Sequence, residues 1–389
     1  MNPDTPLHPR ENPHLIGHAE AERTLLAACN AGKIPHAWLI TGVQGLGKAT
    51  LAYRFARLLL ANGAPGASAE AEAPSLFGDA LPAVKTEAFS LEISPDHPTF
   101  KRVVSGGHAD LHVIEPTNLD DDGKEKASWE IRVWQIRALE KTLRRSAAEA
   151  GWRVAIIDSA DDMNRNAANA LLKILEEPPA RTVLLLVSHH PGRLLPTIRS
   201  RCRQLALRPL PEAEVRKVLE GFRFQVPGFS EENLLTETRN PTPETSFAIA
   251  LAEGSPGFAA RMYAEGGLGL YRDMVAALAG LPRLDIVAVQ DFGAELAKKD
   301  QDARWEMFNY MFGWFLSKAV EEGLNGSPAP HFAEGERELR ARLLAVSSID
   351  RIAEMWEKTA RTAALGDDLH MDRALVVEEM LGMLQTGKP

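Results

Sequence analysis

The sequence predicts an α/β fold in which a five-stranded, mostly parallel sheet with helices on both faces precedes a small helical lid and an all-α C-terminal domain. Three observations predict it. A glycine-rich loop at 42–50 stands between a short apolar segment and a helical pattern. Near-continuous apolar segments at 152–157 and 182–187 have the composition of strands buried on both faces, as in parallel sheets. From residue 268 onward the apolar periodicity is helical throughout.

Composition is that of an ordinary globular protein. The chain has 389 residues, of which 25% are charged and 45% hydrophobic, and a formal net charge of −9, which argues against a large nucleic-acid-coating surface. No signal-peptide pattern and no apolar run long enough for a bilayer are present, so we expect a cytoplasmic protein without membrane contact. Cys29 and Cys202 are too far apart in sequence for a zinc knuckle, and two cysteines make no disulfide framework.

The elements follow in a regular order. We expect a helix in 13–30, the strand and loop described above, an irregular insertion at about 61–106, a strand at 111–114, an amphipathic helix at 131–143, strands at 152–158, 182–188 and 204–207, and a helix at 164–177. We expect the Trp134 side chain to face the hydrophobic core. The aromatic residues between 305 and 315 predict a bundle core or a subunit interface.

The glycine-rich loop has the form of a phosphate-binding P-loop. Its backbone N–H groups would turn toward phosphate oxygens beside the positive end of the following helix. In the P-loop pattern the residue after the lysine holds Mg²⁺ through a hydroxyl, but here that residue is Ala49. Thr50 is one residue later and about 100° further round the helix. The candidate nucleotide-binding residues are Gly42, Gly45, Gly47, Lys48, Ala49, Thr50 and Asp158.

Asp158 ends a buried strand, where open α/β sheets place their ligands. This is the form of a Walker B carboxylate, which orients Mg²⁺; the alternative is a helix-capping or loop aspartate. Ser159 follows, where hydrolytic AAA+ proteins usually have the glutamate that polarises water, and a serine is a poor base. Asp161 and Asp162 are weak candidates to replace it.

Several motifs resemble the bacterial clamp-loader family of AAA+ proteins, over about 13–60 and 108–210. They are Asn169–Pro179 (NALLKILEEPP), Ser200-Arg201-Cys202, His36–Gly42 and Thr197-Ile198-Arg199. In that family the Ser-Arg-Cys arginine is a finger offered in trans to ATP on the neighbouring subunit. The resemblance therefore implies that Arg201 is the catalytic arginine, with Arg199 a weaker candidate.

Three departures separate the chain from the hydrolytic gamma/tau members of the family. Ala49 and Ser159 are two, and the third is Gly257, where the family's second sensor arginine would fall; Arg261 lies one turn later. We therefore expect weak ATP or ADP binding and no intrinsic ATPase. The family's four-cysteine zinc module has no counterpart in 61–106, which contains no cysteine, so no zinc is expected.

The resemblance implies a three-domain subunit of the DNA polymerase III clamp loader: an AAA+ domain (1–208), a lid (209–267) and a helical collar (268–389). Its partners would be gamma/tau and delta subunits in a ring, with the sliding clamp and primer–template DNA reached through the complex. Lys173 and Arg181 are weak candidates for DNA contact. The alternatives are an active gamma/tau-like or other AAA+ ATPase and, less favoured, a P-loop nucleotide kinase.

Overall fold

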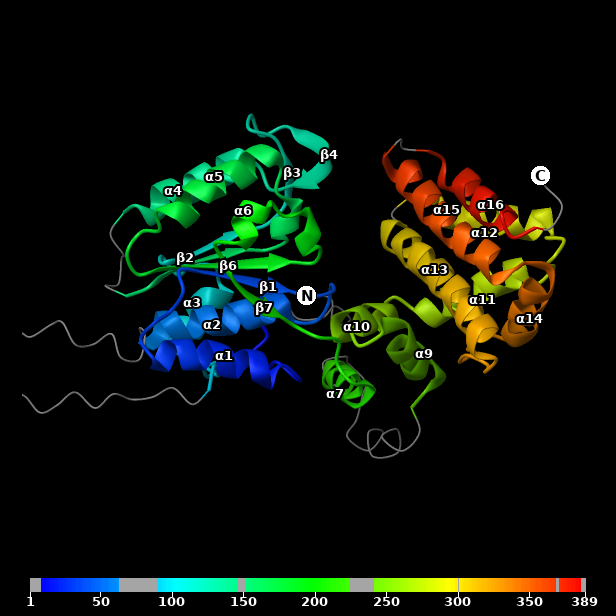
Figure 1. The fold of residues 1–389 in the computed structure, drawn as a ribbon, viewed down its shortest axis with the longest axis horizontal. Helices are drawn as coiled ribbons and strands as arrows, with labels where there is room; N and C mark the ends of the chain where they lie inside the picture. Colours follow the sequence, from blue (N-terminus) through cyan, green and yellow to red (C-terminus); the bar gives the residue numbers. More distant parts are fainter. Residues whose placement is uncertain are drawn as a thin grey trace, which may run out of the picture. The chain divides into compact units, whose positions relative to one another are not determined.

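Five strands form the main sheet, and all four of its strand pairings are parallel. Their order is β2-β5-β6-β1-β7 (Figure 1). The strands are β1 (Ala37–Thr41), β2 (Leu111–Ile114), β5 (Arg153–Ile157), β6 (Thr182–Ser188) and β7 (Arg203–Ala206). Every residue of β1 and β6 is buried, which explains their uninterrupted apolar sequences. The predicted sheet is confirmed.

The computed structural model describes residues 8–62, 90–145, 151–223, 241–299, 301–368 and 371–385. They divide into two compact units: a sheet unit, which extends to residue 217 and includes 254–257, and a helical unit, formed by 218–253 and the residues after 257. Helices α9 (Pro243–Ala252) and α10 (Pro256–Ala264) fall within the predicted lid, but nearly all of their residues belong to the helical unit. The division into three domains stays a prediction.

Helices cover both faces of the sheet (Figure 1). One face packs against α1 (Ala19–Asn30), α2 (Lys48–Asn62) and α3 (Pro98–Val104), and the other against α4 (Val133–Leu143), α5 (Arg165–Glu176) and α6 (Pro196–Arg199). Side chains alternate along β1, so that Trp38 and Ile40 enter the first core and Ala37 and Leu39 the second.

The first helix is shorter than predicted, because α1 begins at Ala19 rather than near residue 13. Gly17 lies in the left-handed region, with φ of +93°, and a Cβ there would stand 2.5 Å from the Leu210 side chain. The segment before α1 is therefore an extended chain that passes close to residue 210, and glycine is what permits that approach.

The predicted irregular insertion is partly wrong, since α3 lies within it. Pro98 opens this helix, the His97 ring accepts a hydrogen bond from the Thr99 N–H, and Phe100 and Val103 are buried. Residues 63–89 of the insertion lie outside the described part. The acidic segment at 120–123 is the turn of an unpredicted hairpin formed by β3 (Thr117–Leu119) and β4 (Glu125–Glu130).

The expectation for Trp134 is wrong: this side chain is 39% exposed. Ile136, Leu139 and Leu143 carry the buried face of α4. Trp134 lies two positions before Ile136, which is about 200° away round the helix, so that it points away from the sheet.

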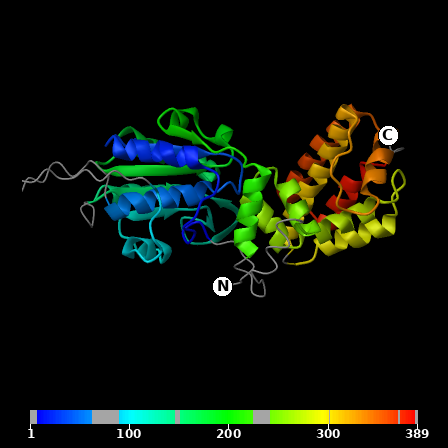
Figure 2. The ribbon, with the colours of Figure 1, turned by 90° about the horizontal axis from the view of Figure 1, so that it is seen from below.

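The helical unit is a bundle (Figure 2). Its long helix α13 packs against α11, α14 and α15, and α12 packs against α16. The helices are α11 (Gly267–Leu278), α12 (Ile286–Leu296), α13 (Asp302–Asn325), α14 (Glu336–Val346), α15 (Ile349–Asp368) and α16 (Arg373–Gly382), and α7 (Glu212–Arg223) precedes α9. Five of the aromatic residues on α13 are buried, as predicted for a bundle core, whereas Tyr310 is 39% exposed. Among the described residues, no helix combines the length and the apolar character needed to cross a membrane.

Candidate functional site

Three central strands end at the same edge of the sheet. Strand β6 pairs with β1 so that Thr41 lies opposite Ser188, and with β5 so that Ile157 lies opposite Leu186. The residues that follow these strands are Gly42, Asp158 and His189. The P-loop and the candidate Walker B carboxylate therefore meet at the carboxyl ends of neighbouring strands, where α/β sheets bind ligands.

The loop conformation depends on its glycines. Gly42, Gly45 and Gly47 have φ angles of +145°, +82° and +87°, which other residues adopt only with strain. A Cβ on Gly42 would stand 2.8 Å from the Leu207 carbonyl oxygen, and one on Gly47 would stand 2.7 Å from the Leu15 side chain. The sequence therefore forms the loop that a phosphate site requires.

The carbonyl groups of residues 42–46 are all hydrogen-bonded within the sheet unit. Lys48 Nζ donates to Gly42 O (2.7 Å) and Val43 O (2.6 Å), Ser255 Oγ to Gln44 O (2.7 Å), the Gly257 N–H to Gly45 O (2.9 Å) and His18 Nε2 to Leu46 O (2.8 Å). In the described part of the chain, the N–H groups of Gly45, Gly47, Lys48 and Ala49 have no acceptor of the chain's own. Their free donors and the start of α2 fit a phosphate group.

Burial displaces the pKa values of both charged groups at this edge. Lys48 is 2% exposed, and burial lowers its pKa to about 8. Burial, aided by the negative charge of Glu115, raises the pKa of Asp158 to about 6. Between about pH 6 and pH 8 both groups are therefore charged, as a cation for phosphate and an anion for a metal require.

A magnesium ion fits this edge less well than a phosphate group. The side chain of Ala49 carries no oxygen. Thr50 has the nearest hydroxyl along α2, but it is buried at 6% exposure. Among the residues that the structure describes, no cluster of three His, Cys, Asp or Glu side chains is placed to hold a metal ion. The one protein oxygen that remains for Mg²⁺ in the Walker pattern is the carboxylate of Asp158, which burial makes harder to ionise.

The position after Asp158 is occupied by a hydrogen-bonded serine. Ser159 adopts a left-handed conformation, with φ of 58°, and its Oγ lies 3.2 Å from His189 Nε2. Burial and the nearby charge of Lys48 lower the pKa of His189 to about 4, so the imidazole is neutral at pH 7. Sequence reasoning missed His189, although it follows β6 as Asp158 follows β5.

Asp161 serves as a backbone cap. Its carboxylate accepts hydrogen bonds from the N–H groups of His189 (3.0 Å) and His190 (2.9 Å), and its side chain is 2% exposed. These bonds hold its pKa below the usual range. A carboxylate engaged in this way is unsuited to activate water.

Gly257 packs directly on the P-loop, where the family would place a sensor arginine. A Cβ on Gly257 would stand 2.9 Å from the Gly45 carbonyl oxygen. Arg261 pairs instead with carboxylates of its own helical unit, at 2.6 Å from Glu306 and 3.3 Å from Glu265. Both described ion pairs of Arg261 are thus formed within its own unit.

Arg201 lies at the opposite edge of the sheet, where the parallel strands begin. It precedes β7, whose Arg203 pairs with Trp38 near the start of β1, whereas the P-loop follows Thr41 at the end of β1. Three residues of strand separate these levels by about 10 Å. Arg201 donates from Nη1 to the Thr197 carbonyl (3.1 Å) and pairs through Nη2 with Glu176 (2.9 Å), and its side chain is 37% exposed. The structure therefore separates Arg201 from the nucleotide-binding candidates.

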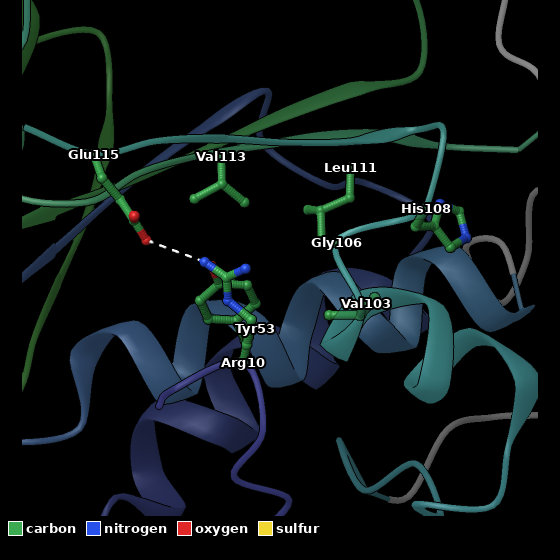
Figure 3. A pocket seen from close by; sticks show the side chains of 8 residues that line it. All are labelled: Arg10, Tyr53, Val103, Gly106, His108, Leu111, Val113 and Glu115. Atoms are coloured by element: carbon green, nitrogen blue, oxygen red, sulfur yellow. Dashed lines mark ion pairs between the residues drawn. The ribbon is translucent and has the colours of Figure 1, made fainter. Parts of the chain in front are cut away.

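A cavity of about 280 Å³ lies beside β2 (Figure 3). It is lined by Arg10, Tyr53, Val103, Gly106, His108, Leu111, Val113 and Glu115. Arg10 reaches across it to Glu115, with 3.6 Å between their charged atoms. None of the P-loop residues lines this cavity, but Glu115 contributes to the raised pKa of Asp158.

Comparisons with known proteins find similarity to subunits of DNA polymerase III. Residues 88–211 match the family model described as "DNA polymerase III, delta subunit". "DNA polymerase III subunit delta'" of Pseudomonas aeruginosa is 36% identical over 233 residues, which cover 59% of this chain and 56% of that protein. The Bacillus subtilis protein of the same name is 40% identical over 121 residues, 31% of this chain and 34% of that protein.

A gamma/tau subunit is also similar. "DNA polymerase III subunit gamma/tau" of Mycobacterium tuberculosis is 29% identical over 205 residues, which cover 53% of this chain and 30% of that protein. The chain thus spans between about a third and somewhat more than half of the length of these curated relatives. The chain thus resembles the DNA polymerase III delta-prime subunits, and its residues 88–211 match the family model described as DNA polymerase III, delta subunit.

Proposed function

We propose that the chain is a delta-prime-like clamp-loader subunit of DNA polymerase III, which supplies Arg201 in trans to ATP bound by a neighbouring gamma/tau-like subunit. The names of its relatives support the assignment to that polymerase. The position of Arg201 carries the proposal. It is exposed, and it lies at the opposite edge of the sheet from the chain's own P-loop. From there it meets a nucleotide only on another subunit.

The chemistry of this finger is electrostatic. A guanidinium is charged at every relevant pH and offers several N–H donors in a plane. Placed against the γ-phosphate, Arg201 would stabilise the charge that spreads over its oxygens in the transition state. Loss of such a finger lowers turnover at the site it serves by about 10³-fold or more.

The chain's own nucleotide site would bind ATP or ADP without hydrolysing ATP. Free N–H donors and Lys48 suit the phosphates of ATP or ADP, which the loop would hold weakly and with little help from Mg²⁺. Ser159 is bonded to a neutral His189, and Asp161 caps a backbone turn, so neither is suited to deprotonate water. We infer that the loop contributes to structure and assembly rather than to hydrolysis.

The proposed partners are gamma/tau-like and delta-like subunits in a ring, with the sliding clamp and primer–template DNA reached through the complex, in the cytoplasm. Lys173 and Arg181 are exposed and remain the candidates for direct DNA contact. The helices from residue 268 onward, with the aromatic core of α13, are the proposed collar through which the subunits join.

Reconstitution with gamma/tau and delta subunits tests the proposal. Arg201→Ala should lower the ATPase that clamp and primed DNA stimulate, whereas Arg199→Ala, a change of the same type two residues earlier, should leave it within about twofold. Equal rates for wild type and Arg201→Ala would contradict the finger assignment, and a loss confined to Arg199→Ala would move the role to that residue.

A catalytically active gamma/tau-like ATPase is the alternative, and the similarity to a gamma/tau subunit together with the intact loop favours it. The isolated chain would then hydrolyse ATP, and Lys48→Ala would abolish the activity. The proposal made here predicts a rate for the isolated wild-type chain that equals the buffer blank.

A further inference from the structure

We propose that Glu176 is a positioning residue, which fixes the guanidinium of Arg201 in the orientation that it presents to the neighbouring subunit. This inference rests on the proposed function of Arg201. Glu176 Oε1 lies 2.9 Å from Arg201 Nη2, and the two residues are far apart in sequence but adjacent at one edge of the sheet. Glu176 is the last residue of α5, and Arg201 follows the last turn of α6.

Two contacts hold the guanidinium and leave most of it available. Nη2 meets the Glu176 carboxylate, while Nη1 donates to the Thr197 carbonyl at 3.1 Å. A guanidinium has five N–H donors in a fixed plane, so two such contacts define that plane and still leave about three donors for a phosphate group. An unheld arginine would have to lose its rotamer freedom at the moment of reaction, and Glu176 removes that cost beforehand.

The position of Glu176 is unfavourable by itself. A carboxylate at the C-terminus of a helix faces the negative end of the helix dipole. Arg201 is the cation that pairs with it there, and Lys173 also lies in the last turn of α5. This placement indicates that the Glu176 carboxylate serves to hold Arg201 rather than to stabilise α5.

The supports on both sides are rigid. Helix α5 buries Leu171, Ile174 and Leu175 in the core against the sheet, and α6 packs against α5. The pair itself is open to solvent, with side-chain exposures of 51% for Glu176 and 37% for Arg201. Exposed ion pairs add little to folding stability, so the consequence of this one should be sought in orientation.

The test uses the reconstituted complex and compares four variants with wild type. They are Glu176→Ala, Glu176→Gln, Arg201→Ala and the double variant Glu176→Ala/Arg201→Ala. Glu177→Ala is the matched control, because Glu177 is the adjacent residue and is also exposed. Stimulated ATPase is measured against ATP concentration, and assembly is measured by titrating each variant into the partner subunits.

Glu176→Ala should lower kcat by about two- to fivefold, the range that an exposed pair can supply. The KM for ATP and the assembly midpoint should not change, whereas a merely structural role would shift the midpoint. Glu176→Gln keeps an acceptor and should fall between wild type and Glu176→Ala. The double variant should match Arg201→Ala, and Glu177→Ala should match wild type.

Three results would overturn the inference: a wild-type or higher kcat for Glu176→Ala, a further loss in the double variant, or an equal loss in Glu177→Ala. A higher kcat would mean that Glu176 restrains the finger. If Arg201→Ala itself has the wild-type rate, the proposed function fails and the positioning role fails with it. A normal Glu176→Ala beside a defective Arg201→Ala refutes the positioning role alone.

Discussion

At the residue scale, Lys48 is buried and Asp158 is partly buried at one edge of the sheet, and the pKa values of both are displaced toward neutrality. Such groups are destabilising in the folded chain unless a ligand compensates them. The loop carbonyls of Gly42 and Val43 compensate Lys48 in part, since they accept its hydrogen bonds. The Ser159 N–H does the same for Asp158.

Replacing Asp158 by asparagine should therefore stabilise the fold near pH 7, by about 1–3 kcal/mol. The pKa of Asp158 is raised from 3.8 to about 6, so the folded state holds a proton that the unfolded state releases between these values. Wild-type stability falls as pH rises through that window and stays lower above it. The advantage of Asp158→Asn should thus be full above pH 6 and fade toward pH 4.

Urea unfolding of both proteins between pH 4 and pH 8 measures this effect. Asp96→Asn is the control, because its side chain is 96% exposed and its removal should give no pH-dependent gain. A less stable Asp158→Asn at pH 7 would show that the carboxylate is better compensated than its burial indicates.

At the scale of elements, the turn at 254–257 is part of the P-loop structure. Ser255 and Gly257 together occupy two of the loop carbonyls, and the Gly257 backbone is within contact distance of Gly45. The loop is therefore held from outside by a turn that lies about 210 residues further along the chain.

Gly257→Ala should disturb this turn. The added Cβ would stand 2.9 Å from Gly45 O and 3.0 Å from Gly45 Cα, so the backbone of one segment must shift. Overpacking of this kind costs about 1–3 kcal/mol. Differential scanning calorimetry should show a lower Tm, whereas Gly192→Ala, at a site where nothing lies within 4 Å, should leave it nearly unchanged. An unaltered Tm for Gly257→Ala would mean that the turn is not fixed to the loop.

The start of α14 holds a buried charge network within the helical unit. Arg340 and Glu336 are fully buried and paired, and Glu336 also accepts hydrogen bonds from the Tyr271 hydroxyl (2.7 Å) and the Phe332 N–H (2.7 Å). Arg340 also donates to the carbonyl groups of Ala329 and Pro330. The network thus fastens the loop between α13 and α14 to the bundle.

Arg340→Met should cost about 3–5 kcal/mol of folding free energy, because it leaves Glu336 buried without its cation. Arg337→Ala, on the exposed side of the same helix, should cost less than about 0.5 kcal/mol. Urea denaturation followed by circular dichroism compares the two. Similar midpoints for both variants would show that the buried pair contributes little.

For the whole molecule, local pattern was enough to predict the strands of the sheet, the glycine-rich loop and the helix at 164–177, since each of these depends on neighbours in sequence. Asn164, for example, accepts from the Ala167 N–H as its position before a helix predicts. The hairpin of β3 and β4 was missed because its strands are short and polar. Trp134 was misplaced because an aromatic residue in an apolar pattern was assumed to face inward.

Side-chain contacts between distant segments could not be predicted from the sequence. Nothing in the spacing of residues brings Glu176 to Arg201, Asp161 to His189 or Glu115 to Arg10. These contacts depend on strand order, which brings together segments that are far apart in the sequence. The opposite placement of Arg201 and the P-loop follows from the parallel pairing of β7 with β1, and it became visible only in the assembled sheet.

The central claim is that Arg201 completes a nucleotide site on another subunit. The most direct measurement is the ATPase of the gamma/tau and delta subunits, with clamp and primed DNA present, as wild-type chain or Arg201→Ala is titrated in. We expect equal titration midpoints, because assembly is intact, and a lower plateau for Arg201→Ala, because the nucleotide site that this arginine serves has lost its finger. Equal midpoints with equal plateaus would contradict the finger assignment.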